Sequence, residues 1–173
     1  MKEYQTGQLR NVCLIGHGGV GKTTLSEAIL YDCKEIDRMG RVEEGTTICD
    51  YDPEEKKRQI SISTAIAPCN WRDSKINIID TPGYFDFVGE VKEGLRSADS
   101  AIIMICAVSG IQVGTEKMWN FCRESTLPRA FFINKVDREN ANFDKVLNSL
   151  KENFGISVVP LQIPIGKEAD FKI

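Results

Sequence analysis

Five segments of the chain have the pattern of buried or half-buried strands. They are short, and most are rich in β-branched and other apolar residues. A polar turn at 72–74 joins the second segment to the third, which indicates a hairpin. The five segments are LRNVCLIG (9–16), SISTAIAPCNW (61–71), KINIID (75–80), AIIMICAV (101–108) and RAFFIN (129–134).

Hydrophobic residues recur at helical spacing between these segments. The order of the elements is strand, helix, long loop, strand, strand, helix, strand, helix, strand, helix. This order predicts an α/β domain, with a mostly parallel sheet, one antiparallel hairpin and helices on both faces. The clearest helical stripes are Leu25, Ala28 and Ile29, then Met118, Phe121 and Cys122, then Phe143, Val146, Leu147 and Leu150, the last stopped by Gly155.

Composition narrows the class of protein. With 173 residues, 42% hydrophobic and 27% charged, the chain resembles one ordinary soluble domain. Its net charge of -3 gives no reason to expect direct, sequence-specific nucleic-acid binding by this domain. Residues 1–10 lack the apolar core of a signal peptide, and the run 101–108 is too short to span a membrane. Six cysteines without a C-x-x-C pair or a cysteine–histidine cluster predict reduced thiols, no zinc site and a cytoplasmic protein.

The segment GHGGVGKT, residues 16–23, fits G-x-x-x-x-G-K-[ST] between a strand and a helix. Glycines there let backbone N–H groups turn toward phosphate oxygens, and the helix N-terminus adds partial positive charge. Lys22 supplies a point charge to the outer phosphates, and Thr23 offers its hydroxyl to magnesium. The alternative is a chance glycine-rich turn. The candidate phosphate-binding residues are His17, Gly18, Gly19, Val20, Gly21, Lys22, Thr23 and Thr24.

Residues 34–60 form a long connection in which 14 of 27 residues are charged. Compact domains rarely contain so long a structureless loop unless it is functional or mobile. Composition alone fits a solvated surface insertion. Its position between a phosphate loop and the next strand favours a switch that a ligand orders.

Asn134, Lys135 and Asp137 form N-K-x-D at the end of the strand segment RAFFIN, whose last residue is Asn134. Guanine presents N1–H and N2–H₂ donors side by side, and the Asp137 carboxylate is placed to accept from both. Adenine lacks this donor pair, so a site built on it rejects adenine by roughly ten-thousand-fold or more. The alternative is a polar turn that leads into the last helix. The motif therefore predicts GTP and GDP as ligands rather than ATP.

Asp80 and Gly83 form D-x-x-G at the end of the segment KINIID. Asp80 is expected to hold the magnesium shell, and the Gly83 amide to contact the terminal phosphate. Gly83 and Lys22 are therefore candidate catalytic residues as well as nucleotide-binding ones. The three motifs occur in the order that a P-loop GTPase requires.

At this point the chain resembles the translational GTPases, and elongation factor G most closely. The stretches that carry the resemblance are GHGGVGKTTLSEAIL, IIDTPGYFDFVGE, AVSGIQVGTEKMW and INKVDRENANF. The stretches GRVEEGTTICDYDPEEKKR and GYFDFVGE are more typical of the elongation-factor-G-like paralogues. The resemblance implies a P-loop G domain from a cytoplasmic, magnesium-dependent GTPase of protein biosynthesis that acts on the ribosome through the intact parent factor.

Four positions bear on how the resemblance applies to catalysis. Ser61 aligns with the switch threonine, which makes it a third candidate magnesium ligand beside Thr23 and Asp80. Gly18 stands where the family usually has an apolar residue, and Gly19 where it usually has aspartate. Tyr84 replaces the histidine that orients the attacking water, and it becomes a candidate catalytic residue. Phosphoryl transfer depends on such positioning, and a phenol of pKa about 10 cannot become a cation near neutral pH.

The C-terminal residues lead to an expectation about domains. Residues 1–156 are expected to be the N-terminal part of the G domain, and 157–173 the start of an insertion within it. No Ser-Ala guanine-contact loop follows Asp137, so we expect a sheet truncated before its last strand and helix, with the remainder of the parent protein absent. Three functions compete: a GTPase with a low intrinsic rate, a GTP-loaded ribosome-binding switch with little or no hydrolysis, and an ATPase, which N-K-x-D disfavours.

Overall fold

The computed structural model describes residues 3–166 and 168–172. Its strands are β1 (Leu9–Gly16), β2 (Ala65–Trp71), β3 (Ser74–Asp80), β4 (Ser100–Cys106) and β5 (Arg129–Asn134). Its α-helices are α1 (Lys22–Asp32), α2 (Pro53–Arg58), α3 (Val88–Arg96), α4 (Val113–Glu124) and α5 (Phe143–Phe154). Short 3₁₀ turns are η1 (Thr6–Gln8), η2 (Val42–Glu44), η3 (Phe85–Phe87) and η4 (Glu168–Asp170).

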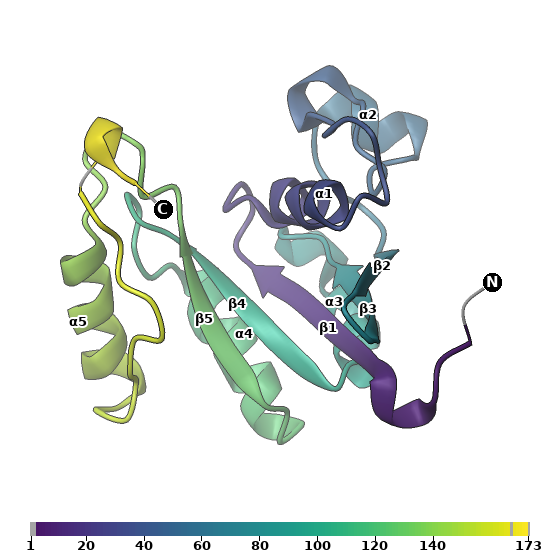
Figure 1. Ribbon diagram of the computed structural model, residues 1–173. Helices are drawn as coiled ribbons and strands as arrows, with labels where there is room; N and C mark the ends of the chain where they lie inside the picture. The colour runs from purple at the N-terminus through teal and green to yellow at the C-terminus, as the bar shows by residue number, and fades with distance from the viewer. Residues whose placement is uncertain (1–2, 167, 173) are drawn as a thin grey trace.

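The described strands form one twisted sheet in the order β2-β3-β1-β4-β5 (Figure 1). β1 lies at the centre and pairs in parallel with β3 and β4, and β5 pairs in parallel with β4. β2 and β3 pair antiparallel through the turn at Arg72, whose φ of 53° is left-handed. The predicted fold class, a mostly parallel α/β sheet with one hairpin, is confirmed.

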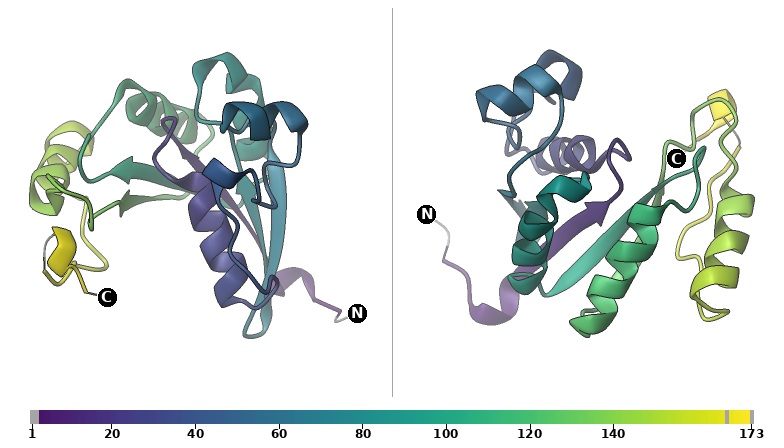
Figure 2. Two further views of the ribbon diagram at one scale, coloured as in Figure 1. Left: turned by 90° about the horizontal axis from the view of Figure 1, so that it is seen from above. Right: turned by 180° about the vertical axis from the view of Figure 1, so that it is seen from behind.

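Helices cover both faces of the sheet (Figure 2). On one face, α1 packs over a cluster that includes Leu14, Leu30 and Ile78. On the other face, α3 and α4 pack over a cluster that includes Ile103 and Met118. Each cluster draws on alternate residues of the same strands, because neighbouring strand residues point to opposite faces.

The same face as α4 also carries α5. Val146 and Leu150 of α5 pack on Ile105, which points to the same side of β4 as the residue two positions earlier. Three stacked or tilted rings strengthen this contact, since Trp119 and Phe154 each lie within 5.3 Å, centroid to centroid, of Phe131. The helix therefore fixes the outer strand β5 and the segment that follows it.

Residues 34–60 contain more structure than the sequence predicts. The turn η2 and the six-residue helix α2 lie within the segment, which sits over α1 (Figures 1 and 2). Asp52 caps α2 by accepting a 2.7 Å hydrogen bond from the Glu54 amide, and Pro53 starts the helix. The segment therefore contains local structure, and its interpretation as a switch that a ligand orders stays a prediction.

Candidate functional site

The three sequence motifs meet at one edge of the sheet. β1, β3 and β5 run parallel to one another, so the residues that follow them emerge at the same carboxyl edge. This is the edge where ligands bind in open α/β sheets. The phosphate loop after β1 lies between the D-x-x-G turn after β3 and the N-K-x-D segment after β5.

Lys22 lies buried at the start of α1 with its amine turned back into the phosphate loop. Its Nζ donates 3.1 Å hydrogen bonds to the carbonyl oxygens of Gly16 and His17. Burial lowers the pKa of Lys22 to about 8, although the carboxyls of Asp80 and Asp50 oppose this shift. The buried Lys22 amine therefore lies close to two acidic side chains, Asp80 and Asp50.

Hydroxyl and carboxyl oxygens converge beside this lysine. The Thr23 and Ser61 hydroxyl oxygens lie 3.1 Å apart, and the Ser61 hydroxyl donates a 2.7 Å hydrogen bond to Asp50 Oδ1. Thr47 donates a 3.2 Å hydrogen bond to the other Asp50 oxygen. Asp50 is only 3% exposed and was missed by the sequence analysis. The charged loop around it gives no sign of which of its many acids turns inward.

Asp80 is the buried acid at the end of β3. Neither of its carboxyl oxygens makes a well-formed hydrogen bond among the described residues. Burial raises the pKa of Asp80 to about 7, although the nearby Thr23 hydroxyl and Lys22 amine lower it. A buried, unpartnered carboxyl beside two hydroxyls is a set of hard oxygen donors that suits Mg²⁺. No group of three or more His, Cys, Asp or Glu that could hold a metal occurs in the described ranges. Any cation here would depend on the hydroxyls of Thr23 and Ser61 as well.

The N-K-x-D segment is braced against the phosphate loop. Asn134 Nδ2 donates a 2.9 Å hydrogen bond to the Val20 carbonyl, and Lys135 Nζ donates a 2.7 Å bond to the Gly19 carbonyl. A Cβ on Gly21, whose φ is +96°, would lie 2.5 Å from Asn134 Nδ2, so glycine is required there for both space and backbone. Asp137 is exposed beyond this brace, where its carboxylate faces solvent.

The D-x-x-G turn lies directly on the phosphate loop. A Cβ added to Gly83 would lie 2.5 Å from Lys22 Nζ and 2.7 Å from the Gly18 backbone nitrogen. A Cβ added to Gly18 would lie 3.0 Å from Cζ of Tyr84. Of the candidate catalytic residues, Gly83 therefore lies against both Lys22 and Gly18, and Tyr84 lies against Gly18.

The two remaining phosphate-loop candidates lie at its margins. Thr24 is exposed on the first turn of α1. His17 is half-buried, and its Nδ1 has no hydrogen-bond partner within the described part of the chain. The His17 ring meets that of Phe85 edge to face at 6.3 Å. These contacts join His17 to the turn that follows Gly83.

Two buried glutamates organise residues 34–63, and the sequence analysis missed both. Glu27 of α1 is fully buried and accepts hydrogen bonds from the Gly40 amide at 2.9 Å and the Ile48 amide at 2.6 Å. Glu55 of α2 accepts from the amides of Ile62 and Ser63 at 2.9 and 3.0 Å. Glu55 therefore fixes the two residues that follow Ser61.

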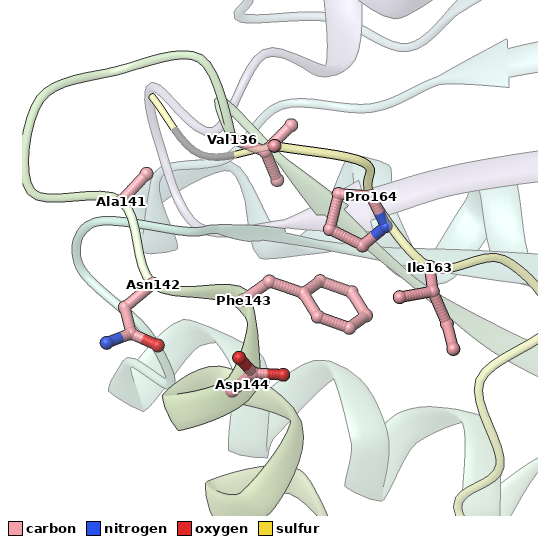
Figure 3. A pocket seen from close by; sticks show the side chains of 8 residues that line it. Val136, Ala141, Asn142, Phe143, Asp144, Ile163 and Pro164 are labelled. Carbon is pink, nitrogen blue, oxygen red and sulfur yellow. The ribbon is translucent and has the colours of Figure 1, made fainter. Parts of the chain in front are cut away.

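A cleft of about 120 Å³ lies beside the N-K-x-D segment but outside the phosphate loop (Figure 3). Val136 and Phe143 line it from one side, and Ile163 and Pro164 of the C-terminal segment line it from the other. The Glu168 side chain holds this segment in place by accepting a 2.7 Å hydrogen bond from the Asn140 amide. The cleft is mainly apolar and contains none of the residues that converge on Lys22.

Comparisons with known proteins agree with this arrangement. The family model for the elongation factor Tu GTP binding domain matches residues 7–169. The chain is 44% identical over 160 residues to the elongation factor G-like protein of Mycobacterium tuberculosis, covering 92% of this chain and 22% of that protein. It is 43% identical over 164 residues to elongation factor G 2 of Borreliella burgdorferi, covering 95% of this chain and 24% of that protein.

A solved structure shows the same fold. The crystal structure of a protein from Thermus thermophilus superposes with a TM-score of 0.90 at 39% identity, over 95% of this chain and 24% of that one. The chain thus spans about a quarter of the length of the relatives it matches. In the described ranges, no helix is both long enough and apolar enough to cross a membrane.

Proposed function

The chain belongs to the elongation factor Tu GTP-binding domain family, and we propose from this that it is the GTP-binding and GTP-hydrolysing domain of an elongation-factor-G-like translation factor. The observation that carries the proposal is the meeting of three motifs at one sheet edge, where Lys22 and Asp80 are buried together. Guanine-nucleotide binding is the property of the family. The residue roles, hydrolysis and action on the ribosome are our assignments.

The phosphates would bind across the loop 16–24. Its backbone amides and the α1 N-terminus favour negative charge, and Lys22 neutralises the outer phosphates. Because the Lys22 amine already lies against Gly83, one terminal phosphate would contact both the amine and the Gly83 amide. The guanine base would be read by Asp137, with Asn134 and Lys135 holding that segment on the loop.

A magnesium ion would be held by Thr23, Ser61 and Asp80, with Asp50 as the acceptor that orients the Ser61 hydroxyl. When bound, magnesium neutralises charge on the phosphates. The Asp80 carboxyl would ionise beside a cation, whereas burial alone raises its pKa to about 7. Glu55 would keep Ser61 in register by holding the two residues that follow it.

Hydrolysis would depend on Tyr84. Its hydroxyl-bearing ring end lies over the phosphate loop at Gly18, within the region where the terminal phosphate would meet Gly83. A phenol hydroxyl can accept a hydrogen bond from water and donate one, so it can orient a nucleophile without becoming charged. We expect a low intrinsic rate that the ribosome increases, in a cytoplasmic protein that works through its intact parent factor.

The alternative is a GTP-loaded switch that docks on the ribosome with little or no hydrolysis. Tyr84 is the observation that favours it, because a phenol cannot provide the positive charge of an imidazolium near neutral pH. In either case, residues 1–156 are proposed as part of the G domain and 157–173 as the start of its insertion.

The two functions differ in one measurement, the release of phosphate from GTP by the intact parent factor with and without ribosomes. Release that ribosomes increase in the natural protein supports hydrolysis. Release only by a Tyr84→His variant supports the switch. A Lys22→Ala variant gives the background, because it should not retain nucleotide.

A further inference from the structure

Gly18 of the phosphate loop lies against the ring of Tyr84, which begins the turn after Gly83. A Cβ on Gly18 would lie 3.0, 3.1 and 3.3 Å from Cζ, Cε2 and Cε1 of Tyr84. These three atoms form the hydroxyl-bearing end of the ring. Each of these distances is shorter than ordinary carbon–carbon contact of about 3.5–4.0 Å. A side chain at position 18 would therefore compete with the ring for the same space.

The backbone does not explain why position 18 is glycine. Gly19 and Gly21 have φ angles of +73° and +96°, where a side chain is strained, whereas Gly18 lies outside that region. Nothing else lies as near to its added Cβ as the Tyr84 ring. The Tyr84 ring, rather than the backbone, is therefore what a side chain at this position would meet.

Neighbouring contacts hold the turn and leave the Tyr84 ring free to rotate. The Phe85 ring lies 4.6 Å from Lys117 Nζ and meets His17 edge to face. The Phe87 amide donates a 3.1 Å hydrogen bond to the Tyr84 carbonyl. Tyr84 is 46% exposed, so its ring can rotate into solvent without moving the turn. The lack of a side chain on Gly18 is what leaves room for the ring in its inward position.

We propose that Gly18 is the positioning residue for Tyr84, and that the two act as one unit at the reacting phosphate. The effect of this pair on hydrolysis rests on the proposed function, whereas the contact between Gly18 and Tyr84 does not. A methyl or larger group at position 18 moves the phenol away from the phosphate loop. A histidine at position 84 is shorter and leaves Gly18 uncovered, so a side chain at position 18 would then have room to pack.

The first test measures where Tyr84 lies, without reference to activity. The intact parent factor is labelled with 3-fluorotyrosine, and the Tyr84 resonance is the one missing from Tyr84→Phe. Gly18→Ala should shift this resonance toward the position of solvent-exposed tyrosine, while Gly89→Ala should not, because nothing lies within 4 Å of an added Cβ on Gly89. An unchanged Tyr84 resonance in Gly18→Ala overturns the proposal.

The second test measures whether the pair acts as a unit. Phosphate release and GTP affinity are compared for the natural protein, Gly18→Val, Tyr84→His and the double variant, with ribosomes. Contacting residues couple in their effects, so the double variant should hydrolyse at least about twofold faster than the product of the single effects predicts. GTP affinity should change much less than kcat, because Gly18 positions Tyr84 rather than binding through a side chain.

The outcomes separate this inference from the proposed function. If the effect of the double variant on kcat equals the product of the two single effects, Gly18 and Tyr84 do not act as one unit. That result overturns the proposal even if all four proteins hydrolyse GTP. If none of the four releases phosphate, the proposed hydrolysis is wrong, and the Tyr84 resonance still decides the role of Gly18.

Discussion

The hydroxyl oxygens of Thr23 and Ser61 lie 3.1 Å apart, although 38 residues separate them in the chain. Thr23 lies in the first turn of α1, and Ser61 precedes β2, so the pair joins the phosphate loop to the end of the segment 34–60. Asp50 fixes the Ser61 side of the pair through a 2.7 Å hydrogen bond. Two hydroxyls held this way are ready to face one cation together.

Replacing Ser61 should therefore affect the triphosphate more than the diphosphate. Ser61→Ala is expected to weaken GTP binding in magnesium about tenfold, the size of one hydrogen bond to a charged group. GDP binding should change less than about twofold by the same scale, since the switch residue is assigned to the GTP-bound form. Titration with both nucleotides checks this, and Ser61→Thr should keep the natural preference. Equal losses for GTP and GDP would remove Ser61 from the proposed metal site.

Lys22→Ala should abolish nucleotide binding and leave the fold intact. Burial lowers the pKa of the Lys22 amine to about 8, which means that the folded chain disfavours the charged form. Removing the amine should therefore not destabilise the fold. Equilibrium binding of GTP and circular dichroism measure the two effects. Lys145→Ala, on an exposed position of α5, is the matched control. Normal GTP affinity in Lys22→Ala would contradict the phosphate-loop assignment.

Asp137→Asn should change the base that is bound. The asparagine amide can donate to the extra oxygen of xanthine, whereas the natural carboxylate only accepts. The ratio of xanthosine to guanosine triphosphate affinity should rise by at least about a hundredfold, as polar base contacts discriminate strongly. Asp32→Asn, which makes the same chemical change on an exposed residue, should leave the ratio unchanged. Continued strong preference for GTP would show that another residue reads the base.

Asp80→Asn should stabilise the nucleotide-free protein in EDTA. Burial raises the pKa of Asp80 from its ordinary 3.8 to about 7, so the folded chain holds this proton more tightly than the unfolded chain. The stability contributed by protonation is therefore present at low pH and lost as pH rises from about 4 to about 7. Because an amide has no such loss, the free energy of unfolding of Asp80→Asn should exceed that of the natural protein by about 2–4 kcal/mol near neutral pH.

Hydrogen exchange of the β1 and β3 amides in the intact parent factor measures that difference at each pH. Protection in Asp80→Asn should exceed that of the natural protein at about pH 7 and converge with it near about pH 4. Asp32→Asn controls for the change in net charge. Parallel profiles for the natural protein and Asp80→Asn would mean that Asp80 is solvated or paired in solution.

Glu27→Ala should release the segment 34–48 from α1. The substitution removes both acceptors that hold the Gly40 and Ile48 amides, each worth about 1.5–3 kcal/mol as a charged acceptor. Trypsin should then cleave after Lys34, Arg38 or Arg41 at least about tenfold faster in the absence of nucleotide, as local opening becomes easier. Mass spectrometry of the fragments locates the cuts. Glu152→Ala, at an exposed position of α5, should digest at the natural rate.

Local patterns were sufficient to predict the sheet and the three motifs. The predicted strand 9–16 coincides with β1, and the segment RAFFIN coincides with β5. Phosphate-loop glycines and the N-K-x-D residues follow strands directly, so strand direction alone brings them to one edge. Their placement needed no knowledge of distant contacts.

Long-range partners could not be predicted in this way. A glutamate such as Glu27 is usually exposed on a helix. Only the folded chain shows that two backbone amides from the following loop donate hydrogen bonds to its side chain. Glu55 could have been found in part, because Asp52 and Glu55 make a capping box around Pro53. Its bonds to Ile62 and Ser63 depend on how the loop turns back. The contact between Gly18 and the ring of Tyr84 likewise joins residues that are far apart in the sequence.

The brace from Asn134 and Lys135 to the phosphate loop affects how the binding free energy of GTP divides between contacts of the base and ordering of the protein. Hydrogen bonds of 2.9 and 2.7 Å within the protein itself join the two loops, so the base has little conformational entropy to remove on binding. A ligand that keeps the phosphates and lacks the base should meet a loop of nearly the same rigidity. The difference in affinity between that ligand and GTP then measures the contacts of the base itself, separated from the ordering of the protein.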